Sequence, residues 1–175
     1  MNRENSEQRH IASVGGTFDT LHPGHKEYLL LAFEFADRVM IYVSSDEYCK
    51  NKKQYEVRQY ATRVQELKDF LVEHNLQNRC EIRCLYHQDV LIVDYLSNPD
   101  LGEKIDMAII GPEYCDFFRE LNCKRKELGM RNFLILIKER VYYKNDSTKD
   151  ISSFKIRKHA EAASYKYEMM KDIDI

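Results

Sequence analysis

The chain has 175 residues, of which 43% are hydrophobic and 32% are charged, and its formal net charge is −2. This length and composition fit one domain with a hydrophobic core of its own. The nearly balanced charge argues against a nucleic-acid-binding surface, and no apolar run approaches the roughly 20 residues that a membrane-spanning helix needs.

The first ten residues, Met1 to His10, are polar and contain no apolar stretch, so they do not resemble a signal peptide. We expect them to form a disordered lead-in, followed by a single domain over residues 11–175. The number of cysteines is five, and no Cys-x-x-Cys pair occurs. An odd count without that spacing argues against a zinc site or a disulfide framework, and it favours a reducing, cytoplasmic compartment.

Short apolar runs alternate with longer amphipathic segments along the chain. In the first half, a strand is expected over 11–16, a helix over 24–36 and a buried strand over 38–45. A lysine-rich loop then leads to a long amphipathic helix over 56–75.

The second half repeats this alternation. Strands are expected over 81–86, 106–111 and 133–137, with helices over 90–96 and 114–128, the latter ended by Gly129. A polar loop precedes a last helix over 153–170. The pattern predicts an α/β fold, a Rossmann-like doubly wound sheet of about five parallel strands with helices on both faces. Ligands of such sheets bind at the carboxyl ends of the strands.

The first strand-to-helix turn carries the most informative motif, Gly15-Gly16-Thr17-Phe18-Asp19-Thr20-Leu21-His22-Pro23-Gly24-His25. Paired glycines let backbone amides approach a ligand closely, and a helix N-terminus favours phosphate. His22 and His25 are three residues apart and can face the same side. Two imidazoles at this place can stabilise a phosphoryl group under attack. The turn has neither the Walker A nor the Gly-x-Gly-x-x-Gly pattern, which removes the usual support for a kinase or an NAD enzyme.

This turn resembles the signature of the HxGH nucleotidyltransferase superfamily. The resemblance implies that the two histidines bind the phosphates of ATP and that Thr17 lies between ATP and the acceptor phosphate. It makes His22, His25 and Thr17 candidate catalytic residues. Gly15, Gly16 and Phe18 join them as expected ATP contacts.

A second motif, Ile151-Ser152-Ser153-x-x-Ile156-Arg157, opens the last expected helix. Serine is a good N-cap, and Arg157 lies one turn later, where it can reach a phosphate oxygen. The stretch resembles the C-terminal ATP-binding motif of the same superfamily, in a form that favours adenylyl over cytidylyl transfer. Ile151, Ser152, Ser153 and Arg157 are therefore expected ATP contacts.

The middle of the chain resembles the archaeal and eukaryotic type of phosphopantetheine adenylyltransferase. The resemblance rests on three stretches: Ser45-Asp46-Glu47, Tyr55-Glu56-Val57-Arg58, and Gly111-Pro112-Glu113-Tyr114 with Asn122, Arg125 and Gly129 after it. It implies that Gly111, Glu113 and Asn122 contact ATP. It also makes Lys52 the preferred catalytic lysine of the 50–53 loop, where an ammonium group could bridge the two reacting phosphates.

The acceptor side departs from the family pattern. After the third strand, members often carry an Asp-Pro-Tyr-Gly-Pro-like loop, whereas this chain has Tyr86-His87-Gln88-Asp89-Val90-Leu91. We expect Asp89 and Leu91 to touch the acceptor together with Thr17 and Lys52. No protein metal ligand is expected.

The resemblance implies transfer of AMP from ATP to 4′-phosphopantetheine, with Mg²⁺ carried by the nucleotide phosphates. Two alternatives remain at this point. One is a related nucleotidyltransferase with another acceptor, such as a cytidylyltransferase or a mononucleotide adenylyltransferase. The other is a nucleotide-binding module without catalysis. No nucleic-acid or membrane partner is expected, and the sequence leaves a homo-oligomer open.

Overall fold

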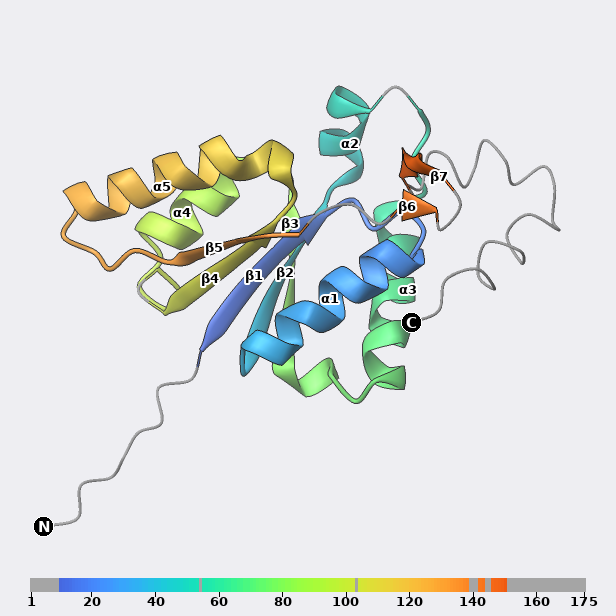
Figure 1. Cartoon of the computed structure of the whole chain (residues 1–175), viewed down its shortest axis with the longest axis horizontal. Helices are drawn as coiled ribbons and strands as arrows, with labels where there is room; N and C mark the ends of the chain where they lie inside the picture. The colour runs from blue at the N-terminus through green and yellow to red at the C-terminus, as the bar shows by residue number, and fades with distance from the viewer. Residues whose placement is uncertain (1–9, 54, 103, 139–141, 144–145, 151–175) are drawn as a thin grey trace, which may run out of the picture.

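Five parallel strands form the sheet at the centre of the protein, in the order β3-β2-β1-β4-β5 (Figure 1). The computed structural model describes residues 10–53, 55–102, 104–138, 142–143 and 146–150. The strands are β1 (Ile11–Gly16), β2 (Arg38–Ser44), β3 (Cys80–Leu85), β4 (Ile105–Ile110) and β5 (Leu134–Ile137). The predicted Rossmann-like sheet of about five parallel strands is confirmed.

Helices cover both faces of this sheet (Figure 1). Helices α1 (Pro23–Phe35) and α3 (Tyr60–Glu73) pack on one face, and α4 (Asp89–Leu96) and α5 (Cys115–Glu127) on the other. The short helix α2 (Asp46–Lys52) follows the carboxyl end of β2. Two short 3₁₀ helices, η1 (Gln77–Arg79) and η2 (Pro112–Tyr114), precede β3 and α5.

Strand β2 shows why the sequence folds in this way. Every residue after Arg38 in this strand is buried, because both faces are covered by helices. Val39, Ile41 and Val43 point into the core under α1 and α3, while Met40 and Tyr42 point into the core under α4 and α5. A continuous apolar run is therefore what this central parallel strand requires.

Three segments differ from the expected elements. Residues 46–52 form helix α2 rather than a loop, because the Ser45 hydroxyl accepts a hydrogen bond from the Tyr48 amide and so caps the helix. Helix α3 begins at Tyr60, not at Glu56. The expected polar loop contains two short antiparallel strands, β6 (Tyr142–Tyr143) and β7 (Asp146–Asp150). The lead-in 1–9 and the expected helix 153–170 lie outside the described residues.

The strand order reverses between β1 and β4. The chain runs from β1 outward through β2 to β3, and then crosses back to β4 and β5 on the other side of β1. Loops at the carboxyl ends of β1 and β4 therefore diverge to opposite faces, which leaves a crevice between them. This topology directs the search for a site to the residues that follow these two strands.

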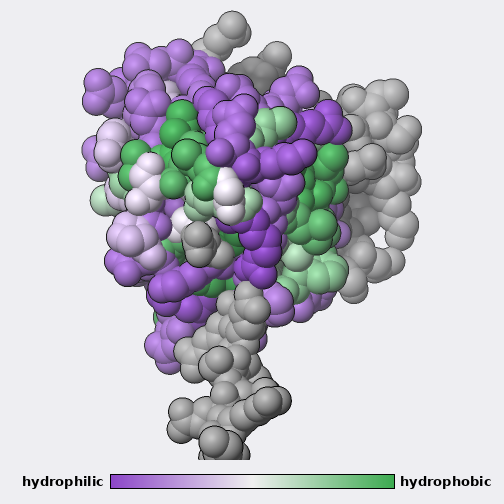
Figure 2. All heavy atoms as spheres, turned by 90° about the vertical axis from the view of Figure 1, so that its left-hand side faces the viewer, coloured by the Kyte–Doolittle hydropathy of each residue, from purple (hydrophilic) through white to green (hydrophobic). Residues whose placement is uncertain are grey.

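One face of the surface is drawn in Figure 2, which looks onto the left-hand side of Figure 1. This face shows apolar patches interrupted by hydrophilic residues. Scattered exposed apolar side chains are normal on protein surfaces. Among the helices that the structure describes, none combines the length and apolar character needed to cross a membrane.

Candidate active site

The turn between β1 and α1 has an unusual backbone. Phe18 has a φ of 49°, in the left-handed region that non-glycine residues rarely adopt. Its side chain is fully buried, and its ring lies against Gly16, where an added Cβ would come within 3.3 Å of it. A strained residue held by its surroundings is common at functional sites. A larger residue at position 16 would require the ring of Phe18 to shift by a few tenths of an ångström.

The two predicted histidines lie together at the N-terminus of α1. His22 is the N-cap residue, and its ring stacks on His25 with centroids 3.8 Å apart. The Nδ1–H of His25 donates to the Thr20 carbonyl at 2.9 Å, because a carbonyl oxygen can only accept. This bond fixes the tautomer and leaves Nε2 of the neutral ring as an acceptor. Phe18 packs beside the His25 ring at a centroid distance of 5.3 Å.

Burial lowers the pKa of His25, while the bond to Thr20 and the charges of Asp19 and Glu66 act in the opposite direction. Lys53 adds to the lowering. His25 is therefore neutral near pH 7 in the free protein. Stabilising an anionic oxygen through Nε2 requires this ring to take up a second proton.

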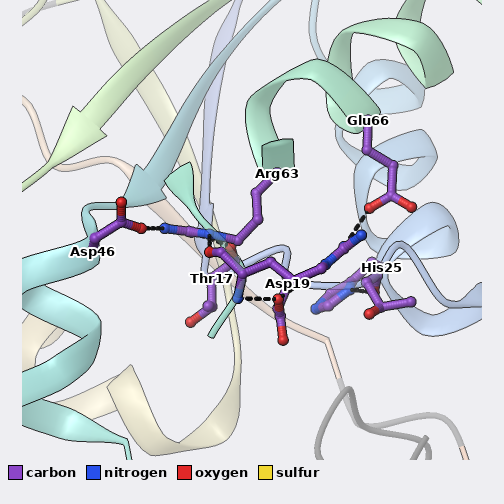
Figure 3. A network of polar contacts seen from close by, with 8 residues as sticks. Thr17, Asp19, His25, Asp46, Arg63 and Glu66 are labelled. Carbon is purple, nitrogen blue, oxygen red and sulfur yellow. Dashed lines mark hydrogen bonds and ion pairs between the residues drawn. The ribbon is translucent and has the colours of Figure 1, made fainter. Parts of the chain in front are cut away.

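A network of charged side chains holds the turn against α2 and α3 (Figure 3). Arg63 of α3 is fully buried and donates to three partners: the carbonyl of Thr17 at 2.6 Å, the carbonyl of Arg58 at 2.8 Å and the carboxylate of Asp46 at 2.9 Å. The planar guanidinium suits such a junction, since its donors point in several fixed directions. Arg63 thereby ties the Thr17 turn to the first residue of α2.

A second arginine braces the same turn from its other side. The backbone N–H and Nε of Arg58 both donate to the buried carboxylate of Asp19, at 2.9 and 3.2 Å. The same guanidinium donates to Glu66 of α3 at 2.6 Å. The charges of Asp19 and Glu66 also raise the pKa of His25, so these hydrogen bonds lie close to the histidine pair.

A cavity of about 320 Å³ opens at the carboxyl ends of β1, β2 and β4. Its volume is within the range of small-molecule sites. The charged residues of its lining are Lys52, Lys53 and Glu113. The remainder of the lining is uncharged and consists of Ser13, Val14, Gly15, Gly16, Thr17, Tyr28, Tyr42, Ser44, Tyr48, Cys49, Leu85, Gln88, Leu91, Ile109, Ile110, Tyr114, Phe117 and Phe118.

Thr17 joins the histidine turn to this cavity. Its carbonyl accepts a hydrogen bond from Arg63, and Thr17 itself lines the cavity together with Cys49, a buried residue of α2. His22 and His25 are not among the lining residues. The histidine pair therefore lies beside the cavity and not in its wall, and the segment Gly16-Thr17 connects the two.

The lysines after β2 differ in their positions. Lys52 and Lys53 both line the cavity, whereas Lys50 does not. The ammonium of Lys52 lies 4.7 Å from the ring centroid of Tyr48, and that of Lys53 lies 5.9 Å from the ring centroid of Tyr55. The end of helix α2 and the residue after it thus present two cations to the cavity. The charge of Lys53 also lowers the pKa of His25, an effect that sequence reasoning did not anticipate.

The remaining expected contacts lie in different places. Leu91 and Glu113 line the cavity, and Glu113 packs on Gly111 so closely that a Cβ there would come within 2.5 Å of its carboxylate. Asp89 is exposed and lies 3.0 Å from His87. Asn122 is outside the cavity, since its amide donates to the carbonyl of Phe133 and accepts from the Phe133 amide. Ile151, Ser152, Ser153 and Arg157 lie outside the described residues.

Sequence reasoning did not single out Arg63 or Tyr28. Arg63 lies on the buried face of α3 beside Leu67 and Phe70, so a helical plot with arginine on its apolar stripe would have drawn attention to it. Tyr28 lies within the helix that was expected over 24–36. Its hydroxyl reaches the cavity, but nothing in the local sequence distinguishes that position from an ordinary core residue.

Several known proteins are similar to this chain. The cytidylyltransferase-like family model matches residues 13–159. A phosphopantetheine adenylyltransferase of Methanopyrus kandleri is 30% identical over 124 residues, covering 71% of this chain and 74% of that protein. One of Pyrococcus horikoshii is 45% identical over 125 residues, with coverages of 71% and 74%. Among solved structures, a protein of unknown function from Archaeoglobus fulgidus has a TM-score of 0.56 at 26% identity, covering 73% of this chain and 97% of that chain.

Proposed function

This chain belongs to the cytidylyltransferase-like family, together with archaeal phosphopantetheine adenylyltransferases, and from this membership we propose that it transfers the adenylyl group of ATP to 4′-phosphopantetheine. The products are dephospho-CoA and pyrophosphate. The observation that carries the proposal is the stacked histidine pair at a helix N-terminus, next to a cavity that combines two lysines with a largely uncharged lining.

The chemistry explains why the site needs cations and donors rather than a base. The acceptor phosphate is largely dianionic at neutral pH, because its second pKa is about 6. One of its oxygens attacks the α-phosphorus of ATP while the bond to the leaving pyrophosphate breaks. The barrier comes from bringing two anions together in line and from the charge that develops on the phosphoryl oxygens.

The described residues can be given roles in this reaction. Thr17 and Lys52 hold the attacking phosphate, with Lys53 as a second cation at the same cavity. His22 and His25 face the phosphates of ATP at the positive end of α1. We assign Ser152, Ser153 and Arg157 to the same phosphates, and Gly15, Gly16, Gly111 and Glu113 to the nucleoside side.

The uncharged part of the cavity fits the arm of the acceptor. Leu85, Leu91 and Phe117 supply apolar walls, while Gln88 brings a polar group among them. Such a lining suits a flexible chain of methylenes and amides, which needs a few hydrogen-bond partners in an otherwise apolar channel. We place the pantetheine arm there, with its phosphate toward Lys52 and Thr17.

We also propose that the ATP is used as its Mg²⁺ complex. Glu113 is the one carboxylate among the residues that line the cavity, and no group of three or more potential metal-ligating side chains occurs in the described part of the chain. That donor set fits an ion coordinated mainly by phosphate oxygens and water, as is usual for Mg²⁺ on nucleotides. When bound, the ion would neutralise phosphate charge and orient the triphosphate.

We also propose the cellular compartment in which the protein works. All five cysteines are free thiols, including Cys49 in the cavity wall. Free thiols are typical of a reducing environment, so we propose that the protein works in the cytoplasm. Burial raises the pKa of the Cys49 thiol, which keeps it protonated and of low reactivity.

A pyrophosphate-release assay tests the reaction. ATP and CTP are each offered with 4′-phosphopantetheine, nicotinamide mononucleotide, flavin mononucleotide or no acceptor. We expect release only with ATP and 4′-phosphopantetheine, and dephospho-CoA as the second product. Release with CTP, or with another acceptor at a higher kcat/KM, would identify a sister enzyme. ATP binding without release for any acceptor would indicate a non-catalytic nucleotide-binding protein.

The variant His25→Ala serves as the catalytic control. Loss of a donor to the phosphoryl group is expected to lower kcat about 100-fold or more. The far-ultraviolet circular dichroism of the variant should stay that of the wild type. Near-normal turnover in a folded His25→Ala variant would remove the histidine pair from the mechanism.

A further inference from the structure

Strands β1 and β4 separate before either of them ends. Their pairing stops at Val14 and Ile109, although β1 continues to Gly16 alongside β2, and β4 continues to Ile110 alongside β5. The separation falls at the point where the strand order reverses. Something must therefore satisfy the backbone groups that would have formed the next rung between the two strands.

Tyr28 of α1 takes that place. The Gly15 amide donates to the Tyr28 hydroxyl at 3.2 Å, and the hydroxyl donates in turn to the carbonyl of Ile109. A direct bond from Gly15 to Ile109 would continue the parallel ladder by one rung. The hydroxyl is inserted between this donor and this acceptor, so it satisfies both and keeps them apart. Burial raises the pKa of Tyr28, so the hydroxyl keeps its proton.

The lining of the cavity agrees with an opening at this point. Val14 and Ile109 belong to the face of the sheet under α1 and α3, whereas Ile110 lies on the face under α4 and α5, as does Ser13, whose hydroxyl hydrogen-bonds Tyr95 of α4. All four residues line the same cavity, together with Tyr28. A closed sheet would separate residues of opposite faces, because successive side chains of a strand point in opposite directions.

We propose that Tyr28 is a positioning residue of the nucleotide site, whose hydroxyl holds the ends of β1 and β4 apart so that the nucleotide can enter between them. The inference rests on the proposed use of ATP by this site. Tyr28 acts through the backbone of Gly15 and Ile109, and thereby fixes where Gly16 and Thr17 begin their turn.

The substitution Tyr28→Phe removes the hydroxyl and keeps the ring. The Gly15 amide and the Ile109 carbonyl then lose their bridge, and the strands can close to bond directly. Closure narrows the crevice and displaces the start of the turn. We expect the Kd for ATP, measured by calorimetry without acceptor, to rise about tenfold, since small displacements in a preorganised site have effects of this order or larger. The KM for 4′-phosphopantetheine is expected to change less than about threefold.

Tyr95→Phe is the matched control. The Tyr95 hydroxyl is also fully buried and hydrogen-bonds the side chain of Ser13 from α4, but it bridges no strands. We expect this variant to lose thermal stability as Tyr28→Phe does and to bind ATP like the wild type. An unchanged Kd in Tyr28→Phe, or an equal loss of ATP affinity in both variants, would overturn the proposal.

Hydrogen exchange tests the bridge in the wild-type protein, whatever the variants do. Gly15 is exposed, yet its amide is expected to exchange as slowly as the paired amides of β1. Fast exchange at Gly15 would rule the bridge out. If the wild type binds ATP but releases no pyrophosphate with 4′-phosphopantetheine, the proposed function fails, while the ATP affinities still decide the role of Tyr28.

Discussion

Replacing Arg63 should reveal how strongly the active-site turn depends on one buried cation. The side chain is fully buried and connects Thr17, Arg58 and Asp46, which belong to three different segments. Arg63→Met keeps much of the apolar volume but leaves the two carbonyls without their partner. A stranded buried acceptor costs about 1–3 kcal/mol. Asp46 is 46% exposed and can return to water at little cost.

The expected loss for Arg63→Met is therefore about 2–6 kcal/mol in the free energy of unfolding, the sum over two carbonyls. A change of 1 kcal/mol shifts the Tm of a chain of this size by about 2–4 °C. The Tm should accordingly fall by roughly 10 °C. Arg63→Lys retains the charge but not the planar fork, so it should lie between Met and the wild type.

The same change should be visible in catalysis. Arg63 joins the turn that carries Thr17 to helix α2, which carries Lys52. At a temperature where all variants are folded, Arg63→Lys should raise the KM for 4′-phosphopantetheine about tenfold, because the two groups that hold its phosphate lose their common anchor. Asp46→Asn should have a smaller effect and cost less than about 1 kcal/mol. Arg63→Met melting within 2 °C of the wild type, with unchanged KM, would refute this reasoning.

Four other predictions concern His25, Lys52 and Asn122. The pKa of His25 is lowered in the folded protein, so the unfolded chain takes up this proton first as the pH falls from about 6.5. The free energy of unfolding should therefore drop in that pH range. The urea midpoint of His25→Gln should depend less on pH there. ATP binding should take up a proton at His25, seen at pH 7 by calorimetry in buffers of different ionisation enthalpy. Lys52→Ala should lower kcat/KM for the acceptor about 100-fold, with Lys50→Ala as the unaffected control on the same helix. Asn122→Ala should lower unfolding free energy by about 2 kcal/mol through its two lost bonds to Phe133, without changing the KM for ATP.

Most of the fold could be predicted because the signals are local. Continuous apolar runs mark the strands, and β1 was predicted with its observed bounds, Ile11–Gly16. Gly129, expected to end α5, has a φ of 72°, which glycine adopts without strain. Helix α2 was missed, although Ser45 followed by Asp46 and Glu47 is a helix-start pattern. Its lysines were interpreted as a loop because the segment has little apolar periodicity.

The residues of the candidate site also differ in how far they could be predicted from the sequence. Residues that form a contiguous motif, such as the turn from Gly15 to His25, could be singled out from the sequence, and their expected roles came from the resemblance to a known signature. Arg63 could not, because the value of a charge on a buried helix face depends on which carbonyls lie opposite to it, and these come from 5 to 46 residues away in sequence. Asn122 was expected to contact ATP from the resemblance, and the structure adds that its side-chain amide pairs with the backbone of Phe133, the residue before β5.

The proposed reaction depends on two adjacent parts of the molecule. The histidine turn is braced from α3 by Arg63 and from the segment before α3 by Arg58, while the cavity is lined from α2, α4 and α5 as well as from the strands. Thr17 belongs to both parts, because its carbonyl accepts from Arg63 and the residue lines the cavity. Attack in line requires the acceptor phosphate to be placed relative to the α-phosphate within a fraction of an ångström. A short turn anchored by a buried arginine can meet this requirement, because any displacement of Thr17 would disturb its bond to Arg63 and the wall of the cavity at once.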